Sequence, residues 1–163
     1  MSHTPKYLGH VNLYVRNAER SKEWYENVLG LHTYDFMPGR AAFMSANKEE
    51  SHEIALMEVG ESAPGPQPGG VGLNHMAWRM ESLEDLKDLY HHLKEQKVPI
   101  DRVNDHGISL GVYFHDPDGN GLEVYYELPR SEWGREKPFT GGAMGRFSGP
   151  WAEPVAASAA AAG

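Results

Sequence analysis

The chain has 163 residues with 40% hydrophobic and 10% aromatic side chains, enough for one compact domain or two small fused modules. Its 15 basic and 23 acidic residues give a formal net charge of −8, which argues against a nucleic-acid partner. The absence of cysteine excludes disulfides and thiolate chemistry, whereas nine histidines leave nitrogen and oxygen metal ligands available.

The first half of the chain predicts a strand, a helix and three further strands. Residues 9–15 alternate between polar and apolar side chains, which places His10 on the face opposite the aliphatic residues. Asn17 is suited to cap the helix that follows, and Gly30 to end it. The further strands are expected at residues 32–36, 41–45 and 53–59.

A Pro/Gly-rich segment at residues 61–70 indicates a linker, after which the pattern begins again. A strand at residues 74–80 places His75 on the polar face, as His10 is placed 65 residues earlier. Ser82 and Asp85 form a capping box for a second helix, which ends before Pro99. Two strands, at residues 112–115 and 122–126, flank a turn at residues 116–120.

The sequence therefore predicts an α+β fold of two tandem βαβββ modules. We expect a single domain at residues 1–129, with module 1 at about 7–60 and module 2 at about 71–129. Residues 130–163 form a C-terminal extension, of which 130–142 is expected to run over the surface and the Ala-rich end to be disordered. The N-terminus lacks an apolar signal core and no stretch approaches the ~20 apolar residues that span a bilayer, so we expect a cytoplasmic protein without a membrane partner.

Three side chains suggest a metal site. His10 and His75 hold equivalent strand positions, so a duplicated fold brings both imidazoles toward one pseudo-twofold axis. If residues 116–120 form the hairpin loop, Tyr113 pairs directly with Glu123 on one face of the sheet. Two histidines and a carboxylate leave coordination positions open, as non-haem Fe(II) oxygenases require, although each side chain can also simply face solvent.

Three segments of the chain resemble the vicinal oxygen chelate superfamily: GHVNLYVRNAERSKEWYENVLG, GLNHMAWRM and VYFHDPDGNGLEVYYE. This superfamily includes glyoxalase I, bleomycin-resistance proteins, fosfomycin-resistance enzymes and type I extradiol dioxygenases. The resemblance covers residues 8–127. It implies that the paired modules form a curved mixed sheet around a metal, with His10, His75 and Glu123 as the ligands.

Two further segments resemble the small extradiol, or catechol 2,3-, dioxygenases. HEIAL begins at His52 and DHGIS contains His106, and Tyr113 matches the active-site tyrosine of that branch. The resemblance implies Fe(II) rather than Mn(II) as cofactor, and O₂ with a small aromatic diol such as catechol or L-DOPA as substrates. It assigns His52 as the acid–base group over the metal, and His106 and Tyr113 as groups that assist proton loss from the diol.

Two alternatives stay open. A glyoxalase I-like lyase or isomerase needs a fourth ligand, but the matching residue is Ala55, and Glu53 and Glu58 are out of position. A metal-free binding protein of the bleomycin-resistance type has no need of the metal ligands. We expect a homodimer, with each site either within one chain or across the two. The remaining histidines and four arginines are expected at the surface, although an arginine can also bind a substrate carboxylate: His3, His32, His91, His92, His115, Arg79, Arg102, Arg130 and Arg135.

Overall fold

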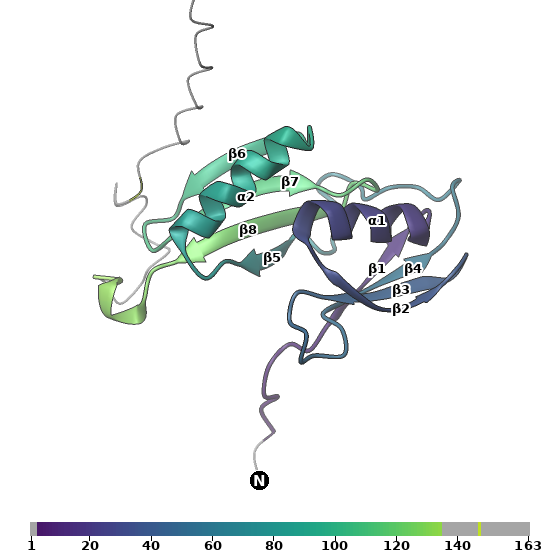
Figure 1. Cartoon of the computed structure of the whole chain (residues 1–163), viewed down its shortest axis with the longest axis horizontal. Helices are drawn as coiled ribbons and strands as arrows, with labels where there is room; N and C mark the ends of the chain where they lie inside the picture. The colour runs from purple at the N-terminus through teal and green to yellow at the C-terminus, as the bar shows by residue number, and fades with distance from the viewer. Residues whose placement is uncertain (1–2, 135–146, 148–163) are drawn as a thin grey trace, which may run out of the picture.

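Two successive units of one strand, one helix and three strands make up residues 3–134, which, with residue 147, are the part of the chain described by this computed structural model (Figure 1). The predicted α+β fold of tandem βαβββ modules is confirmed. The first unit contains β1 (Val11–Val15), α1 (Ala18–Leu29), β2 (His32–Met37), β3 (Ala41–Ser45) and β4 (Ile54–Glu58). The second contains β5 (Met76–Arg79), α2 (Leu83–Glu95), β6 (Ile100–Asp105), β7 (Ser109–His115) and β8 (Gly121–Glu127), followed by a short 3₁₀ helix (Arg130–Glu132).

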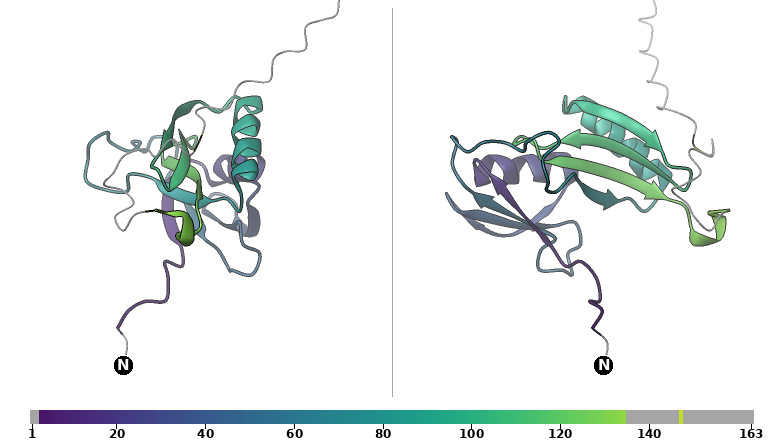
Figure 2. Two further views of the ribbon diagram at one scale, coloured as in Figure 1. Left: turned by 90° about the vertical axis from the view of Figure 1, so that its left-hand side faces the viewer. Right: turned by 180° about the vertical axis from the view of Figure 1, so that it is seen from behind.

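Each unit forms its own four-stranded sheet with the same topology. The strand orders are β1-β4-β3-β2 and β5-β8-β7-β6, so β1 and β5 are edge strands of their sheets. In each sheet the first and last strands pair in parallel, and the other pairs are antiparallel. Both helices lie on the same side of the molecule, where they cover one face of each sheet (Figure 2).

The alternation in β1 explains which face is covered. Leu13 and Val15 are buried toward the helices, whereas the Tyr14 side of the strand is open, with Tyr14 itself 75% exposed. The helix boundaries follow the expected caps: Asn17 accepts a hydrogen bond from the backbone N–H of Arg20, and Gly30 adopts the left-handed conformation, with φ of 66°. The polar residues that alternate with the buried aliphatic residues of β1 therefore point away from the helices.

Strand β6 is absent from the sequence prediction, and β7 begins three residues before its predicted start. The sequence of β6, IDRVND, carries polar residues at most positions because the strand lies at the outer edge of its sheet and pairs only with β7. In β7, Gly111 interrupts the pattern of strand-forming residues.

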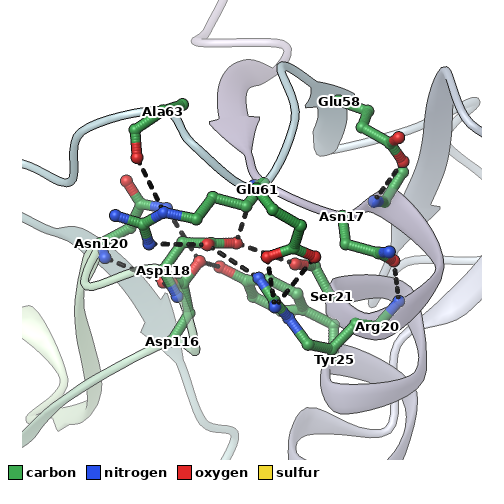
Figure 3. Close-up of polar contacts among 12 residues, drawn as sticks. Asn17, Arg20, Ser21, Tyr25, Glu58, Glu61, Ala63, Asp116, Asp118 and Asn120 are labelled. Atoms are coloured by element: carbon green, nitrogen blue, oxygen red, sulfur yellow. Dashed lines mark hydrogen bonds and ion pairs between the residues drawn. The ribbon is translucent and has the colours of Figure 1, made fainter.

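A buried network of charged and polar groups joins the two units (Figure 3). Asp118, in the β7–β8 turn of the second unit, has a side chain that is only 4% exposed. One carboxylate oxygen lies 3.0 Å from Arg16 Nη1 and 2.9 Å from Arg20 Nη2. The other accepts hydrogen bonds from Ser21 Oγ and the backbone N–H of Arg16. Thus one carboxylate of the second unit satisfies four donors of the first.

The neighbouring turn residue adds a second connection. Asp116 accepts hydrogen bonds from the backbone N–H groups of Asp118 and Asn120, which holds the turn in shape. It also accepts one from the buried Tyr25 hydroxyl, 3.1 Å away on α1. Burial, followed by the nearby Asp116 charge, raises the pKa of Tyr25 well above its usual range, so the phenol remains a hydrogen-bond donor. Helix α1 is therefore fixed on the turn that connects β7 with β8.

No helix in residues 3–134 is long and apolar enough to cross a membrane. The expectations for residues 135–163, the surface segment and the Ala-rich end, fall outside the described residues, apart from Phe147, which is buried.

Replacing Asp118 with alanine is expected to lower the free energy of unfolding by about 2–4 kcal/mol, because Ser21 and two guanidinium groups lose a buried acceptor. The matched control is Glu61→Ala, which removes another carboxylate partner of Arg20, but one whose side chain is 64% exposed. This control is expected to change the free energy by no more than about 1 kcal/mol. Urea unfolding followed by circular dichroism measures both, and similar losses in the two variants would contradict the buried network.

Candidate active site

Four predicted site residues of the second unit form one connected group on the open face of its sheet. Tyr113 and Glu123 are directly paired across β7 and β8, as the predicted hairpin register requires. The Tyr113 hydroxyl donates a hydrogen bond to Glu123 Oε1 at 2.7 Å, and His106 Nε2 lies 2.9 Å from the same hydroxyl. Glu123 Oε2 lies 3.0 Å from His75 Nε2. We call His75, His106, Tyr113 and Glu123 the module-2 half-site.

The two oxygens of Glu123 have separate partners. Oε1 is held by Tyr113, which leaves Oε2 directed at His75. On the other side of the imidazole, His75 Nδ1 faces the side-chain oxygen of Asn74. An oxygen acceptor at Nδ1 is the usual arrangement for a histidine that binds a metal through Nε2, because it fixes both the tautomer and the ring orientation.

The donor atoms also have a suitable spacing for a metal. Two ligands about 2.1 Å from a metal and at right angles to each other are about 3.0 Å apart. The distance between His75 Nε2 and Glu123 Oε2 has this value, which is equally that of a hydrogen bond when Nε2 carries the proton. These two residues therefore fit two positions of a divalent-metal site.

Gly111 is a further site residue, which was not predicted from the sequence. A Cβ atom at this position would overlap Glu123 Oε1 and come within 3.1 Å of the Tyr113 ring. Glycine in the middle of a strand costs stability, and a close approach of other groups is a common reason for its presence. The unexpected glycine in β7 was the available signal.

The two predicted site residues of the first unit lie in contact with each other. The rings of His10 and His52 have centroids 4.4 Å apart, and Phe43 packs edge-on against His52. His10 immediately precedes β1, and His52 precedes β4, the neighbour of β1. We call His10 and His52 the module-1 half-site.

The structure does not bring all three expected metal ligands together in one chain. Among residues 3–134 and 147, no group of three or more histidine, aspartate or glutamate side chains could hold a metal ion. His10 and His75 line the same opening of about 380 Å³ between the edges of the two sheets, but Glu123 does not line it. Among the described residues, His75 therefore contacts Glu123 and shares an opening with His10, but the three expected ligands do not form one group.

A cavity of about 310 Å³ adjoins the module-2 half-site. All four residues of the half-site line it, together with Ala77, Ser109, Tyr125 and Glu127. Its volume suits a small ligand, and Ala77 leaves space beside His75. Arg102, expected at the surface, stacks its guanidinium 3.9 Å from the centre of the Tyr113 ring. This contact could not be predicted from the sequence, because β6, which carries Arg102, was not predicted.

Several other polar side chains make hydrogen bonds that stabilise the fold, which accounts for their presence. Glu53 accepts hydrogen bonds in the β3–β4 loop, and Glu58 accepts one from the backbone N–H of Ala18 at the start of α1. His92 Nε2 donates to the backbone carbonyl of Asn27, which connects the two helices. The remaining interactions at the surface include an ion pair of Arg79 with Glu127, a contact of 2.9 Å between His115 Nδ1 and Asp101 Oδ2, and an edge-to-face contact of the His32 and Tyr34 rings.

Comparison with known proteins assigns the family. Residues 7–124 match the model of the Glyoxalase/Bleomycin resistance protein/Dioxygenase superfamily. The chain belongs to this superfamily. Its similar relatives include biphenyl-2,3-diol 1,2-dioxygenase 2 of Rhodococcus globerulus, at 35% identity over 76% of this chain and 64% of the relative. Catechol-2,3-dioxygenase of Bacillus subtilis is 31% identical over 83% of this chain and 46% of the relative. The chain thus matches less than two thirds of the length of either enzyme.

Solved structures of the superfamily share the fold. A lactoylglutathione lyase from Agrobacterium tumefaciens has a TM-score of 0.62 and 22% identity, with 82% of this chain and 100% of that chain covered. This similarity concerns the arrangement of the modules. Curated relatives named as dioxygenases and a structural neighbour named as a lyase show that the superfamily fold does not by itself determine the reaction.

The electrostatics of the module-2 half-site keep Tyr113 protonated. Burial first, and then the hydrogen bond to the Glu123 carboxylate, raise the pKa of the Tyr113 phenol well above its usual value, and Arg102 opposes this shift. Burial and the nearby Glu127 charge raise the pKa of Tyr125 as well. Tyr113 is therefore a stable donor that orients the carboxylate.

Replacing Glu123 with glutamine is expected to lower the pKa of Tyr113 in chelator-treated protein, because the variant removes the negative charge that disfavours the phenolate. In the wild type, ionisation of Tyr113 needs a higher pH than in this variant. Glu127→Gln is the matched control, since Glu127 acts on Tyr125 and is not among the groups that shift Tyr113. NMR titration of ¹³Cζ-labelled tyrosine measures the pKa, with assignment by Tyr113→Phe. An unchanged Tyr113 pKa in Glu123→Gln would contradict the coupling.

Proposed function

We propose that this protein is an Fe(II)-dependent dioxygenase that cleaves the ring of a catechol, or of a substituted catechol such as L-DOPA, beside its two hydroxyl groups with O₂. The observation that carries the proposal is the connected group His106–Tyr113–Glu123–His75 beside a cavity of about 310 Å³. The relatives named as dioxygenases of biphenyl-2,3-diol and catechol support it.

His10, His75 and Glu123 are the proposed ligands. A metal bound there would favour the ionised form of a chelating diol and provide the redox partner for O₂. Within the chain, Tyr113 fixes Glu123 by holding Oε1, and Asn74 fixes His75 by facing Nδ1. Both contacts direct the remaining donor atoms to one place, which reduces the reorganisation needed when the diol binds.

Proton transfer is assigned to three residues. Tyr113 and His106 face the same cavity and are within hydrogen-bond distance of each other, so a proton from a diol hydroxyl can pass to His106. His52 lies against the proposed ligand His10, and its imidazole can both accept and donate a proton. We assign His52 as the acid–base group that serves the oxygen side of the reaction.

The two alternatives receive less support. A glyoxalase I-like site needs a fourth ligand from the first unit. Ala55 has no donor atom, Glu53 is engaged in a loop, and Glu58 caps α1. A metal-free binding protein would have no use for the oriented donor atoms of His75 and Glu123.

The protein is first loaded with Fe(II) under anaerobic conditions. When catechol and O₂ are then added, it is expected to consume one O₂ per catechol and to form a yellow ring-opened product. Glu123→Ala is expected to lower the rate by more than about 100-fold, because it removes a metal ligand. Glu95→Ala, at the exposed end of α2, is the control and should leave the rate unchanged.

Two results would overturn this function. One is the absence of O₂ uptake with a panel of catechols although the protein holds its full complement of iron. The other is rapid isomerisation of a hemithioacetal by protein loaded with Ni(II) or Zn(II), which would establish the glyoxalase reaction instead.

Gly111→Ala is expected to weaken Fe(II) or Mn(II) binding by about 10–100-fold, because its Cβ would displace the Glu123 carboxylate. Gly72→Ala is the matched control, since a Cβ there meets no atom within 4 Å. Competition with a chromophoric chelator measures the affinity, and circular dichroism verifies the fold of both variants. Equal affinities in the two variants would show that Glu123 does not bind the metal from its position in β8.

A further inference from the structure

The cavity beside the module-2 half-site has two ends of different chemistry. His75, Tyr113 and Glu123 line one end, where the diol is proposed to bind. Glu127 lines the same cavity four residues further along β8, and residues at this spacing lie on one face of a strand, about 13 Å apart. The two glutamate side chains occupy part of this distance, and a benzene ring with a short aliphatic side chain fits the remainder. A diol held at the first end therefore directs its substituent toward Glu127.

The middle of the cavity can accommodate a flat ring. Tyr125 lies between Glu123 and Glu127 on the same face of β8 and lines the cavity. Its neighbours on the adjoining strands are small: Ala77 pairs with Glu123, and Ser109 pairs with Glu127. The Tyr125 ring therefore offers an aromatic surface on which the ring of a diol can lie.

The far end of the cavity carries an ion pair rather than apolar side chains. Glu127 Oε1 lies 3.3 Å from Nη1 of Arg79 on β5, and Arg79 Nη2 also donates to the backbone carbonyl of Glu127. The side chains of Arg79 and Glu127 are 54% and 22% exposed. A large apolar substituent would remove these charges from water without giving them new partners, which disfavours its binding. The far end therefore selects against a diol that carries a second, uncharged ring.

An α-amino acid group matches this ion pair in charge and in spacing. Its ammonium and carboxylate are bonded to one carbon atom, so they lie about as close together as the charges of Arg79 and Glu127. The ammonium can donate to the Glu127 carboxylate, and the carboxylate can accept from the exposed Arg79 guanidinium. An exposed ion pair contributes little to stability, so exchanging its partners for those of a ligand costs little.

We propose that Arg79 and Glu127 determine the substrate specificity, by selecting a catechol whose side chain ends in an α-amino acid group. The ammonium of this group would bind Glu127 and its carboxylate would bind Arg79. The inference rests on the proposed function and specifies the substituent that the diol carries. It favours L-DOPA over catechol itself and over biphenyl-2,3-diol, the compound for which one relative is named.

The test measures the Kd of a series of catechols by isothermal titration calorimetry under anaerobic conditions. L-DOPA carries both charges, dopamine only the ammonium, 3-(3,4-dihydroxyphenyl)propionate only the carboxylate, and 4-propylcatechol neither. The wild type is expected to bind L-DOPA at least about 10-fold more tightly than 4-propylcatechol. Since Arg79 and Glu127 are not metal ligands, the same order is expected with and without Fe(II).

Two variants separate the roles of the charges. Glu127→Gln is expected to weaken binding of L-DOPA and dopamine about 10-fold and to leave binding of the propionate unchanged or tighter. Arg79→Gln is expected to weaken binding of L-DOPA and the propionate by a similar factor, but not that of dopamine. The matched controls are Glu84→Gln and Lys87→Gln, which break an ion pair on α2 and should change none of these affinities. A purely structural role of the Arg79–Glu127 pair would weaken binding of all four compounds alike.

The outcomes separate this inference from the proposed function. Equal affinity of the wild type for L-DOPA and 4-propylcatechol overturns the inference, as does an equal loss for all four compounds in either variant. The expected pattern of losses without any O₂ uptake by the Fe(II)-loaded protein supports the specificity site but rejects the dioxygenase. O₂ uptake with no preference among the four compounds has the opposite meaning. Circular dichroism verifies the fold of each variant, and the comparison within the wild type remains decisive if a variant folds poorly.

Discussion

The burial of the Asp118 carboxylate is the constraint on which the arrangement of the two units depends. Asp118 belongs to the second unit, but its acceptor capacity is used by Arg16, Arg20 and Ser21 of the first. A carboxylate removed from water must keep such partners, because an unpaired buried charge is far more costly than a lost surface ion pair. The network, drawn in Figure 3, therefore determines how the two units meet.

The same turn connects this constraint with the chemistry. Asp116 and Asp118 lie between β7, which carries Tyr113, and β8, which carries Glu123. The turn keeps the two strands in the register that pairs these side chains. Gly111 then leaves room for the carboxylate, and Tyr113 binds one of its oxygens. The second oxygen is free to approach His75, so a local hairpin produces half of the proposed metal site.

Local features of the site could be predicted from the sequence because they depend on short-range geometry. The pairing of Tyr113 with Glu123 follows from the length of the turn between them, and the confirmed caps Asn17 and Gly30 follow from helix-end chemistry. Alternation correctly placed the polar face of β1 away from the core. Such features require only the residues within one element or one hairpin.

Features that depend on distant residues could not be predicted in the same way. The polar sequence of β6 gives little strand signal, so the stacking of Arg102 on Tyr113 was hidden. The position of one unit relative to the other depends on contacts between residues 16–25 and 116–118, about 100 positions apart. Equivalent positions of His10 and His75 in the two units therefore indicated shared chemistry, but not whether both histidines of one chain belong to the same site.

Anomalous X-ray scattering at the iron edge, from crystals of Fe(II)-loaded protein, tests most directly whether His10, His75 and Glu123 hold the metal. The account predicts an iron peak within about 2.3 Å of His75 Nε2 and Glu123 Oε2, with His10 completing the ligand set. An iron bound elsewhere, or an occupied site that excludes Glu123, would contradict it.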